Sequence, residues 1–366
     1  MGQANEIGFT GGGAFHTELK ALVLAFVAEP SRARRAQRKM YVKSAIVVGW
    51  AGASWALLMF VASSWWQAVL LAVSLGLALA GIGFNLIHDA NHGSYSDRRR
   101  LNRTMQWSLD VIGGSSHIWR VKHNVVHHTF TNISGADSDI EQLPFLRFAD
   151  DQPSLWFHRF QHIYAWPLYG LFAIKWQLTG DFQQLRAGNI EGTPLHWPKG
   201  RELAGFWLGK ATFATWAVVV PLLFHPVWQF ALVFLAVSFV WAFTLALTFQ
   251  LAHCVEEAAF TSLDDMTGPG RTEWARHQVE ATVDFAPKSR LLAWYMGGLN
   301  FQIEHHLFSK VCHTHYPAIA PIVREVCARH DVRYQAHTTL WSAIGSHATW
   351  LKRMGAGAST RVVLAQ

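Results

Sequence analysis

The run VWQFALVFLAVSFVWAFTLALTF, residues 227–249, decides the fold of this chain. It holds no charged side chain, and a helix of ~20 such residues crosses the ~30 Å hydrocarbon core of a bilayer with its backbone hydrogen bonds satisfied internally. A second apolar run, roughly residues 203–224, comes immediately before it, and His225-Pro226 joins the two. This short connection predicts a hairpin of two transmembrane helices.

An earlier pair of apolar runs, roughly 44–62 and 67–87, has the same design around the turn Ser63-Ser64-Trp65-Trp66. The composition agrees with a membrane protein, since 51% of the residues are hydrophobic, 15% are charged, and 18 are Trp and 24 Phe. Such numbers are unusual for a soluble protein, whereas bilayer interfaces collect Trp and Tyr. We therefore predict an all-α integral membrane protein with four transmembrane helices in two hairpins, rather than a soluble protein with two buried hairpins.

Basic residues predict how the chain is oriented. Two clusters flank the first hairpin on the same side, and they are Arg32, Arg34, Arg35, Arg38, Lys39, Lys43, Arg98, Arg99, Arg100 and Arg103. The two short turns carry none, so the positive-inside rule predicts that both termini and the long middle segment face the cytoplasm. The expected divisions are a cytoplasmic cap of residues 1–43, 88–202 and 250–366, and hairpins of residues 44–87 and 203–249.

The net charge of +7 does not indicate a nucleic-acid partner. The basic residues sit beside apolar segments, where an anionic leaflet accounts for them, and the sequence contains no nucleic-acid-binding motif. The cysteines, Cys254, Cys312 and Cys327, lack C-x-x-C spacing and indicate free thiols in a reducing compartment.

Residues 156–178 form one further apolar stretch, which His158, Arg159, His162 and Lys175 interrupt. Polar residues at these positions favour a helix that lies in the membrane interface over a fifth span. A fifth span would move the C-terminus to the other side of the membrane.

Three histidine clusters fall within the predicted cytoplasmic segments. They are HDANH at 88–92, directly after the second apolar run, HNVVHH at 123–128 and QIEHH at 302–306. A helical spacing of four puts His88 and His92 on one face, where two imidazoles can share a metal. One such pair is a weak signal, but three clusters on one side of a membrane are a strong one.

The number of clustered histidines exceeds what one metal ion can use, which implies two ions. The seven are His88, His92, His123, His127, His128, His305 and His306. No cysteine lies inside the clusters, which disfavours a structural zinc site. Imidazole suits iron, zinc and copper, so the ligand type alone does not choose the metal.

The clusters resemble the histidine boxes of the membrane fatty-acid desaturase superfamily, H-x(3,4)-H, H-x(2,3)-H-H and (H/Q)-x-x-H-H, in order, spacing and position after the span pairs. The segments HHTFTN at 127–132, GADSDIE at 135–141, and HHLF at 305–308 before HYP at 315–317 are similar to the branch that acts on acyl-CoA or acyl lipids. Gln302, in place of the first histidine of the third box, is typical of the front-end desaturases. Many of these carry a fused cytochrome b domain with an HPGG haem motif, which does not occur here.

The resemblance implies an enzyme that inserts a double bond into an acyl chain carried by coenzyme A, acyl carrier protein or a lipid. It also implies two iron ions, dioxygen, and electrons from a separate ferredoxin, rubredoxin or cytochrome b type carrier with its reductase. Unactivated C–H bonds are beyond side-chain acid–base chemistry, so the metal would oxidise while the protein positions one carbon pair. The same site could serve an acetylenase or hydroxylase. A zinc-dependent membrane hydrolase and a bis-histidine haem electron carrier are the alternatives from other classes.

We predict that His253 is an eighth iron ligand, although it lies outside the three boxes. It stands where the fourth apolar run reaches the cytoplasmic face, and an ionisable group there is costly unless it has a partner. Stearoyl-CoA desaturases, which the chain resembles, have a ligand histidine emerging from the fourth span. In those enzymes an Asn four residues before this histidine assists the metal site, and in this chain that position is Phe249. The alternative is an interfacial or capping histidine.

Other side chains are expected around the ligands. Gln302 is either a weak ligand through its carbonyl oxygen or, as we favour, a hydrogen-bond partner of a ligand. Five carboxylates could accept N–H bonds from ligand imidazoles or remain solvated charges, namely Asp89, Asp137, Asp139, Glu141 and Glu304. Candidate walls of an acyl channel, which could equally be core or interface residues, are Trp119, Trp156, Trp241 and Phe301. The histidines interpreted as structural or interfacial are His16, His117, His158, His162, His196, His225, His277, His313, His315, His330, His337 and His347.

Overall fold

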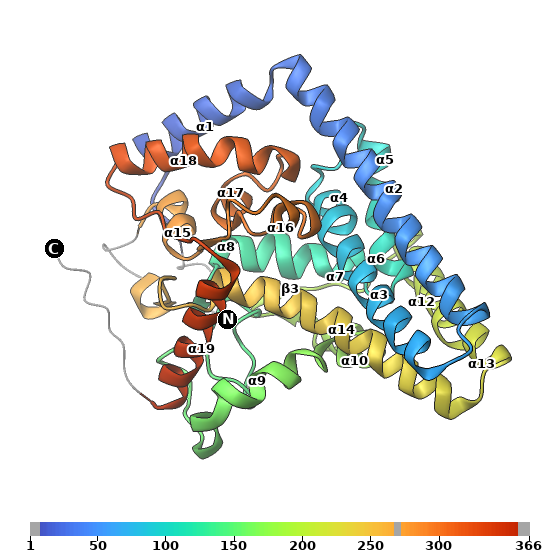
Figure 1. Ribbon diagram of the computed structural model, residues 1–366. Helices are drawn as coiled ribbons and strands as arrows, with labels where there is room; N and C mark the ends of the chain where they lie inside the picture. The colour runs from blue at the N-terminus through green and yellow to red at the C-terminus, as the bar shows by residue number, and fades with distance from the viewer. Residues whose placement is uncertain (1–7, 267–271, 358–366) are drawn as a thin grey trace.

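The computed structural model describes residues 8–266 and 272–357, and these are mostly helical (Figure 1). Four helical stretches in this part of the chain are long and apolar enough to cross a membrane: Pro30–Phe60, Trp65–His92, Arg201–Phe224 and Val227–His253. Each of the four predicted apolar runs lies within one of them, apart from the last residues of the first run. The predicted helical architecture with four membrane-length helices is confirmed.

The first two stretches differ in regularity. The first is one helix, α2 (Pro30–Phe60). The second consists of α3 (Trp65–Ile82), the π-helical turn η1 (Gly83–Ile87) and α4 (His88–His92). The π turn widens the helix just before the first histidine box, and such turns are frequent at functional sites.

Side-chain caps explain where these helices begin. The Glu29 carboxylate accepts a 2.9 Å hydrogen bond from the backbone N–H of Ser31, so α2 begins well before the apolar run does. The Gln67 side-chain oxygen accepts the backbone N–H of Ser63 at 2.9 Å and of Ser64 at 3.2 Å. These bonds close the turn between α2 and α3.

The third and fourth stretches follow the same plan. The third consists of α12 (Arg201–Ala214), the π-helical η5 (Thr215–Val219) and α13 (Val220–Phe224). The fourth is the single helix α14 (Val227–His253). It extends past the predicted apolar run, so that His253 is its last residue.

Helix α3 packs against both α2 and α14. A Cβ atom on Gly76 of α3 would lie 2.7 Å from Cβ of Val240 and 2.9 Å from the carbonyl oxygen of Val237, so only glycine allows this approach to α14. Small residues serve this purpose at helix contacts in membranes. Trp241, 1% exposed, is among the largest side chains of the core between the helices.

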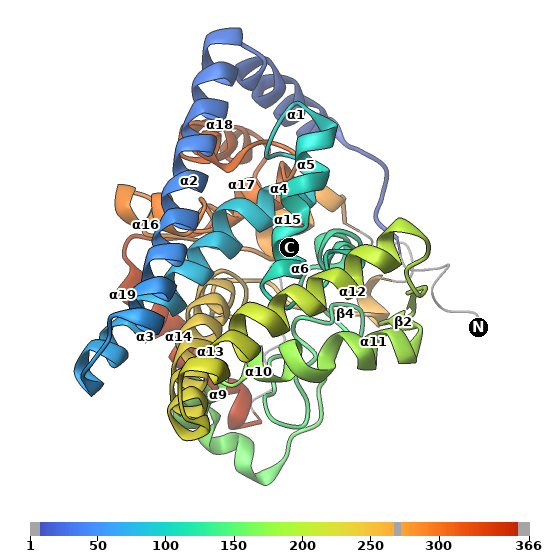
Figure 2. The same cartoon turned by 90° about the vertical axis from the view of Figure 1, so that its right-hand side faces the viewer.

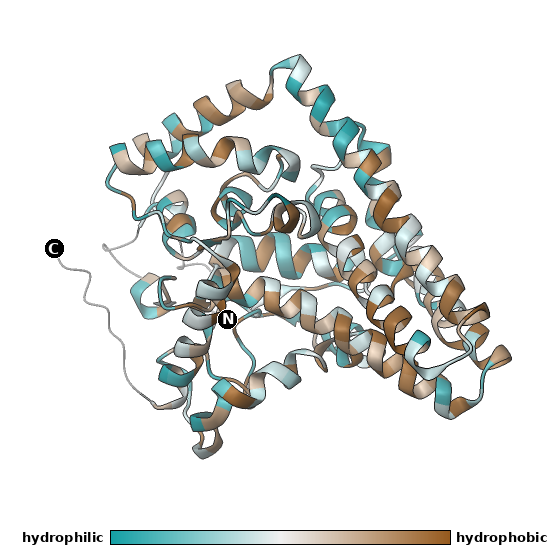
Figure 3. Ribbon diagram, in the orientation of Figure 1, coloured by the Kyte–Doolittle hydropathy of each residue, from teal (hydrophilic) through white to brown (hydrophobic). Residues whose placement is uncertain are grey.

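The two short turns lie side by side at one end of the long helices. Nε2 of His225 is 3.0 Å from the carbonyl oxygen of Met59, and the rings of Phe60 and Phe224 are 5.5 Å apart. This end of the molecule is largely hydrophobic in Figure 3. Large apolar side chains are exposed there, as expected of surfaces that face lipid.

Most other helices gather towards the opposite end (Figures 1 and 2). Those before the third stretch are α1 (Ala14–Val27), α5 (Arg99–Gln106), α6 (Ser108–Val111), α7 (Ser116–Trp119), the π-helical η2 (Arg120–His127), α8 (His128–Phe130), η3 (Trp156–Phe160), α9 (Gln161–Tyr169), α10 (Phe172–Lys175), η4 (Trp176–Gly180) and α11 (Asp181–Ala187). Those after the fourth are η6 (Asp264–Met266), α15 (Trp274–Glu280), α16 (Arg290–Tyr295), α17 (Gln302–Leu307), η7 (His313–His315), α18 (Tyr316–Arg329) and α19 (Leu340–Gly355).

The strands of the described residues are two residues long and tie loops together. Two pairs are parallel, β1 (Ile133–Ser134) with β4 (Thr261–Ser262) and β5 (Asp284–Phe285) with β6 (Ala336–His337). The third pair, β2 (Asn189–Ile190) with β3 (Thr193–Pro194), is antiparallel. The two parallel pairs join segments that are distant in sequence and flank the histidine-bearing elements.

The apolar stretch 156–178 is not one continuous helix. It is divided among η3, α9, α10 and η4, and its buried residues include the polar His158, Gln161 and Gln177. Elsewhere on the same stretch Trp156 is 74% exposed and Ile163 62% exposed. Unlike the four membrane-length stretches, this stretch is interrupted by a turn at residues 170–171.

Candidate metal centre

Eight histidines from four parts of the chain meet in one place. Helix α4 carries His88 and His92, η2 carries His123 and His127, and His128 begins α8. His253 ends α14, and α17 carries His305 and His306. The structure therefore brings together all seven box histidines and also His253.

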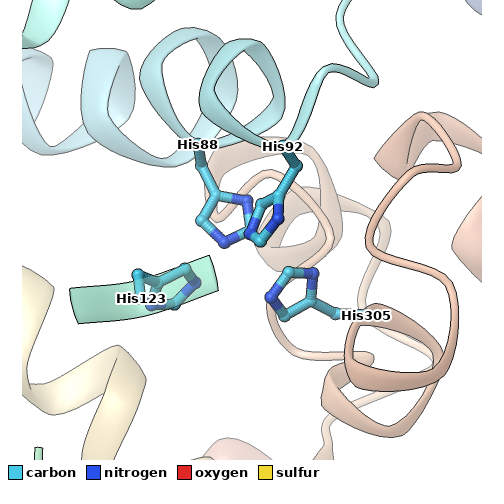
Figure 4. A group of neighbouring side chains, drawn as sticks. All are labelled: His88, His92, His123 and His305. Carbon is cyan, nitrogen blue, oxygen red and sulfur yellow. The ribbon is translucent and has the colours of Figure 1, made fainter. Parts of the chain in front are cut away.

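The ring nitrogens form two principal groups. In one, which we call site A, the candidate ligand atoms of His88, His92, His123 and His305 lie within 4.8 Å of one another, and Figure 4 shows these four rings facing a common centre. In the other, site B, those of His127, His253 and His306 satisfy the same limit.

His128 lies between the two sites. Its ring stacks on that of His306 at 4.4 Å and also lies 4.6 Å from the ring of His305. Its Nε2 is 3.3 Å from Nε2 of His123. These three contacts connect members of site A and site B.

The backbone geometry explains how the second box serves both sites. Arg120–His127 is π-helical, and the rings of His123 and His127 stack 5.3 Å apart. In the first box, which is α-helical, His88 and His92 are 4.7 Å apart and both belong to site A. The two boxes have the same histidine spacing but different backbone geometry. In the π-helical second box His123 belongs to site A and His127 to site B, and both also lie with Asp139 within the same 4.8 Å limit.

The donor atoms fit a metal. Among the described residues, seven of the eight histidines keep a buried ring nitrogen without a hydrogen-bond partner, and they are His88, His92, His127, His128, His253, His305 and His306. Each buried polar atom without a hydrogen-bond partner lowers the stability of the fold by ~1–3 kcal/mol. Seven such histidines in one place therefore require an explanation. Metal ions would use these lone pairs.

The second nitrogen of several rings is held by the protein. Nδ1 of His127 lies 3.0 Å from the carboxylate of Asp137, and both side chains are fully buried. Nδ1 of His306 lies 2.8 Å from the side-chain oxygen of Gln278, and Nδ1 of His305 lies 3.3 Å from the hydroxyl of Tyr316. Such contacts fix the tautomer and the ring orientation of a ligand histidine.

Electrostatics keeps most of these rings neutral. Burial lowers the pKa of His123, His128, His305 and His306 well below the usual range, and neighbouring histidines add to the shift. Burial also opposes charge on His127, but the Asp137 carboxylate outweighs it and raises the pKa of that ring. Neutral imidazole is the form that binds a metal.

His253 contacts Gln302 and Phe249. Its Nε2 lies 2.8 Å from the side-chain nitrogen of Gln302, and its ring stacks on Phe249 at 4.4 Å. The Asn132 side chain donates to the backbone carbonyl of His253 at 2.9 Å. Asn132 has a left-handed φ of 55°, which Asn adopts more readily than most residues, and no motif singled it out.

The five predicted carboxylates separate into different roles. Asp137 contacts a box histidine directly, and Asp139 pairs with Lys122 at 2.7 Å while lying 3.8 Å from His127. Glu141 accepts the backbone N–H of Gly135. Its bond is to backbone rather than to a ligand ring.

Glu304 and Asp89 are buried and have other partners. The Tyr334 hydroxyl donates to Asp284 at 2.6 Å and to Glu304 at 3.1 Å. Burial raises the pKa of Glu304 well above the usual range, and the neighbouring Asp284 adds to this. Asp89 lies 3.0 Å from Nδ1 of His313, a histidine that was interpreted as structural.

Of the four aromatic channel candidates, Trp119 is the one whose ring contacts those of the box histidines in the described part of the chain, whereas Phe301 contacts His305 through its backbone carbonyl at 3.1 Å. The ring of Trp119 stacks on His123 at 4.2 Å and lies 5.5 Å from His92. Trp241 packs in the core beside Trp176, and Phe301 in a second core cluster. Trp156 is a surface residue.

The fold and the site define a helical protein with four membrane-length helices and a buried cluster of eight histidines. Residues 63–338 match the family described as fatty acid desaturase. The chain belongs to this family and is a fatty acid desaturase.

Curated relatives extend the match over almost the whole chain. The sn-1 linoleoyl-lipid 6-desaturase of Arthrospira platensis is 33% identical over 354 residues, which are 95% of each chain. The protein of the same name from Synechocystis sp. is 33% identical over 353 residues, or 96% of this chain and 98% of the relative. An acyl-lipid (8-3)-desaturase of Physcomitrium patens is 38% identical over 320 residues, or 86% of this chain and 66% of the relative.

Proposed function

We propose that the chain is an oxygen-dependent acyl-lipid desaturase with a di-iron centre. The observation that carries the proposal is the set of seven histidines with buried, unpaired ring nitrogens, three in site A, three in site B and His128 between them. Two ions are needed because one ion cannot use so many nitrogens. Iron is preferred over zinc because the chain is a desaturase, and removal of hydrogen from a saturated carbon pair is a redox reaction that zinc does not perform.

Site A, formed by His88, His92, His123 and His305, would hold one iron. Site B, formed by His127, His253 and His306, would hold the other, and His128 would serve between them. With dioxygen, two electrons and two protons, the iron pair would supply the oxidation of an unactivated methylene pair to a double bond, and both oxygen atoms would leave as water. Asp137 keeps the proton of His127 on Nδ1, so that Nε2 stays available as a ligand atom.

The protein must also position the acyl chain and exclude water. The ring of Trp119 covers His123 and lies against His88 and His92, so we assign it to the wall beside site A. Positioning one carbon pair within reach of the metals is the part of the reaction that a protein can contribute.

We assign a membrane lipid as the carrier of the acyl chain, ahead of coenzyme A or acyl carrier protein. Three of the relatives described above are named as lipid desaturases, and two of these are named for a linoleoyl lipid. Helices with exposed apolar side chains adjoin the site, which suits a substrate that stays in the bilayer.

The membrane arrangement that we propose has two hairpins, 44–87 and 203–249, within the longer helices described above. Both termini, the cap of residues 1–43, 88–202 and 250–366, and the metal centre then face the cytoplasm. Support comes from the basic residues in the first part of α2 and in α5 with its N-cap Arg98, and from the location of the histidines at the ends of α4 and α14. The broken stretch 156–178 lies along the interface in this arrangement.

Electrons are proposed to come from a separate ferredoxin, rubredoxin or cytochrome b type protein with its reductase. Within the 366 residues, no HPGG haem motif and no ferredoxin-like cysteine spacing occurs. Turnover by the purified chain with NAD(P)H alone would contradict this part of the proposal.

The test combines product and metal analysis. Cells that express the chain should accumulate a lipid-bound unsaturated fatty acid, and cells that express His127→Ala should not. The purified protein, expressed with ample iron and kept anaerobic, should hold close to two irons per chain. Stoichiometric zinc under these conditions, or an unchanged lipid profile in cells that express the wild-type chain, would contradict the proposal.

A further inference from the structure

Lys43 of α2 is buried although it is a cation, with 5% of its surface exposed. Its Nζ lies 2.8 Å from Nε2 of His313 and 5.5 Å from the centre of the Trp294 ring. Burying an ammonium group costs free energy. The positive-inside rule does not require this burial, because exposed basic residues such as Lys39, one turn earlier on α2, satisfy it equally well. The position of Lys43 therefore calls for an explanation of its own.

The hydrogen bonds define the state of His313. Oδ2 of Asp89 lies 3.2 Å from the backbone nitrogen and 3.0 Å from Nδ1 of His313. A carboxylate only accepts hydrogen bonds, so Nδ1 carries the hydrogen. Nε2 is then the bare nitrogen, which accepts from the Lys43 ammonium. The three side chains thus form one consistent chain of donors and acceptors.

The chain ends beside site A. Asp89 lies next to His88 in sequence and is 1% exposed. With Oδ2 occupied by His313, its other oxygen, Oδ1, lies 3.8 Å from Nδ1 of His88. That nitrogen has no hydrogen-bond partner among the described residues. At 3.8 Å the two atoms form a close polar contact that is longer than a hydrogen bond.

We propose that Lys43 and His313 are positioning residues for site A: they hold Asp89 so that its free oxygen orients the His88 imidazole towards the metal. Oriented carboxylates of this kind are worth about 10- to 100-fold in metal affinity. The network connects α2, η7 and α4, so it also links the position of the first long helix to the geometry of the centre. The inference rests on the two-ion centre proposed above.

A purely structural network would act differently from a positioning network. If the hydrogen bond between Lys43 of α2 and His313 of η7 only stabilised the fold, its loss would weaken both metal sites together. Loss of positioning at His88 affects site A alone, because none of the three network residues contacts His127, His253 or His306. Measuring the metal affinity of each site therefore distinguishes a structural role from a positioning role.

The experiment is an anaerobic titration of the metal-free, detergent-solubilised full chain with Co²⁺, whose visible spectrum reports each binding step. Wild type should bind two ions. Lys43→Met, which keeps the side-chain length and removes the charge and donors, should lower the affinity of one site about tenfold or more and leave the other within about twofold. Lys43→Arg, which restores a cationic donor, should recover part of the loss. The control Lys39→Met changes an exposed lysine on the same helix and should match wild type.

His313→Gln provides a second variant in case Lys43→Met does not fold. Its amide can still donate to Asp89 but cannot also accept from Lys43 in the same geometry, so it should weaken the same single site. Equal weakening of both sites, or wild-type affinities in both variants, would overturn the inference. A wild-type chain that fails to bind two ions would instead overturn the proposed function, so the two failures are distinguishable.

Discussion

The side-chain amide nitrogen of Gln302 lies 2.8 Å from Nε2 of His253, across the contact between α17 and the end of α14. Nδ1 of the same imidazole is buried and has no hydrogen-bond partner among the described residues. An amide can donate or accept by turning about its terminal bond. Turned to accept, Gln302 holds the proton on Nε2 and leaves Nδ1 bare for the metal.

This relationship predicts the effect of two substitutions at Gln302. Gln302→Leu removes both polar atoms at similar volume and should lower the affinity of one metal site about tenfold. Gln302→Glu keeps an acceptor for the ring N–H and should stay within about threefold of wild type. Metal titration of both variants measures the effect. If Gln302→Leu binds both metal ions as tightly as wild type, Gln302 has no role in holding the metal ligands.

A second prediction concerns the contact between His127 and Asp137. Asp137→Asn replaces the carboxylate that raises the pKa of His127 with a weaker acceptor. The affinity of site B should fall about 10- to 100-fold, and product formation should fall with it.

Glu141→Gln is the matched control for this prediction, because Glu141 accepts a backbone N–H and contacts no box histidine in the described structure. Asp137 also accepts the backbone N–H groups of Asn132 and Asp139, so thermal unfolding has to be measured in parallel. Normal metal binding by Asp137→Asn would contradict the assigned role.

The long helices were predictable because a helix that crosses a bilayer must be long and apolar. The residues at which these helices begin and end were harder to predict. Helix α2 begins at Pro30 rather than near residue 44, because Glu29 caps it and the basic stretch before residue 44 is helical although it is too polar to resemble a membrane span. Helix α14 continues to His253 because Gln250 and His253 are buried among the histidine-bearing elements instead of meeting solvent.

The histidines of the centre were predictable from spacing and resemblance, but their partners were not. Gln278 contacts His306, and Tyr316 contacts His305. No local sequence pattern predicts either contact. The π-helical form of η2 is also invisible in a spacing that suits an α-helix equally well. His313 was interpreted as structural, since its neighbours Asp89 and Lys43 are 224 and 270 residues away in sequence.

A third prediction tests whether His253 is a ligand. His253→Ala should remove the ion of site B and abolish product formation, because the other two histidines of that group cannot hold it alone. The control is His225→Ala, at the opposite end of the long helices, where the ring contacts the carbonyl oxygen of Met59. A His253→Ala protein that keeps both its iron and its product yield would show that the three boxes are sufficient.

The last prediction concerns the side of the membrane on which the C-terminus lies. Four spans would bring both termini to one side, and the basic residues in the first part of α2 and in α5 predict that this side is the cytoplasm. The stretch 156–178 could reverse this only as a fifth span. It is broken into four short segments, however, and Gln161 within it donates to the carbonyl oxygens of Arg147 and Leu351, which a lipid-exposed helix would not allow.

A tag at either terminus should therefore be cut by protease in inside-out vesicles and protected in right-side-out vesicles. A tag inserted between Ser63 and Ser64, in the turn that joins α2 to α3, provides the control with the opposite pattern. If the C-terminal tag behaves like the tag in this turn while the N-terminal tag does not, residues 156–178 cross the membrane. Residues 250–357, which carry His305 and His306, would then be separated from the first two boxes, and the metal centre could not form as described.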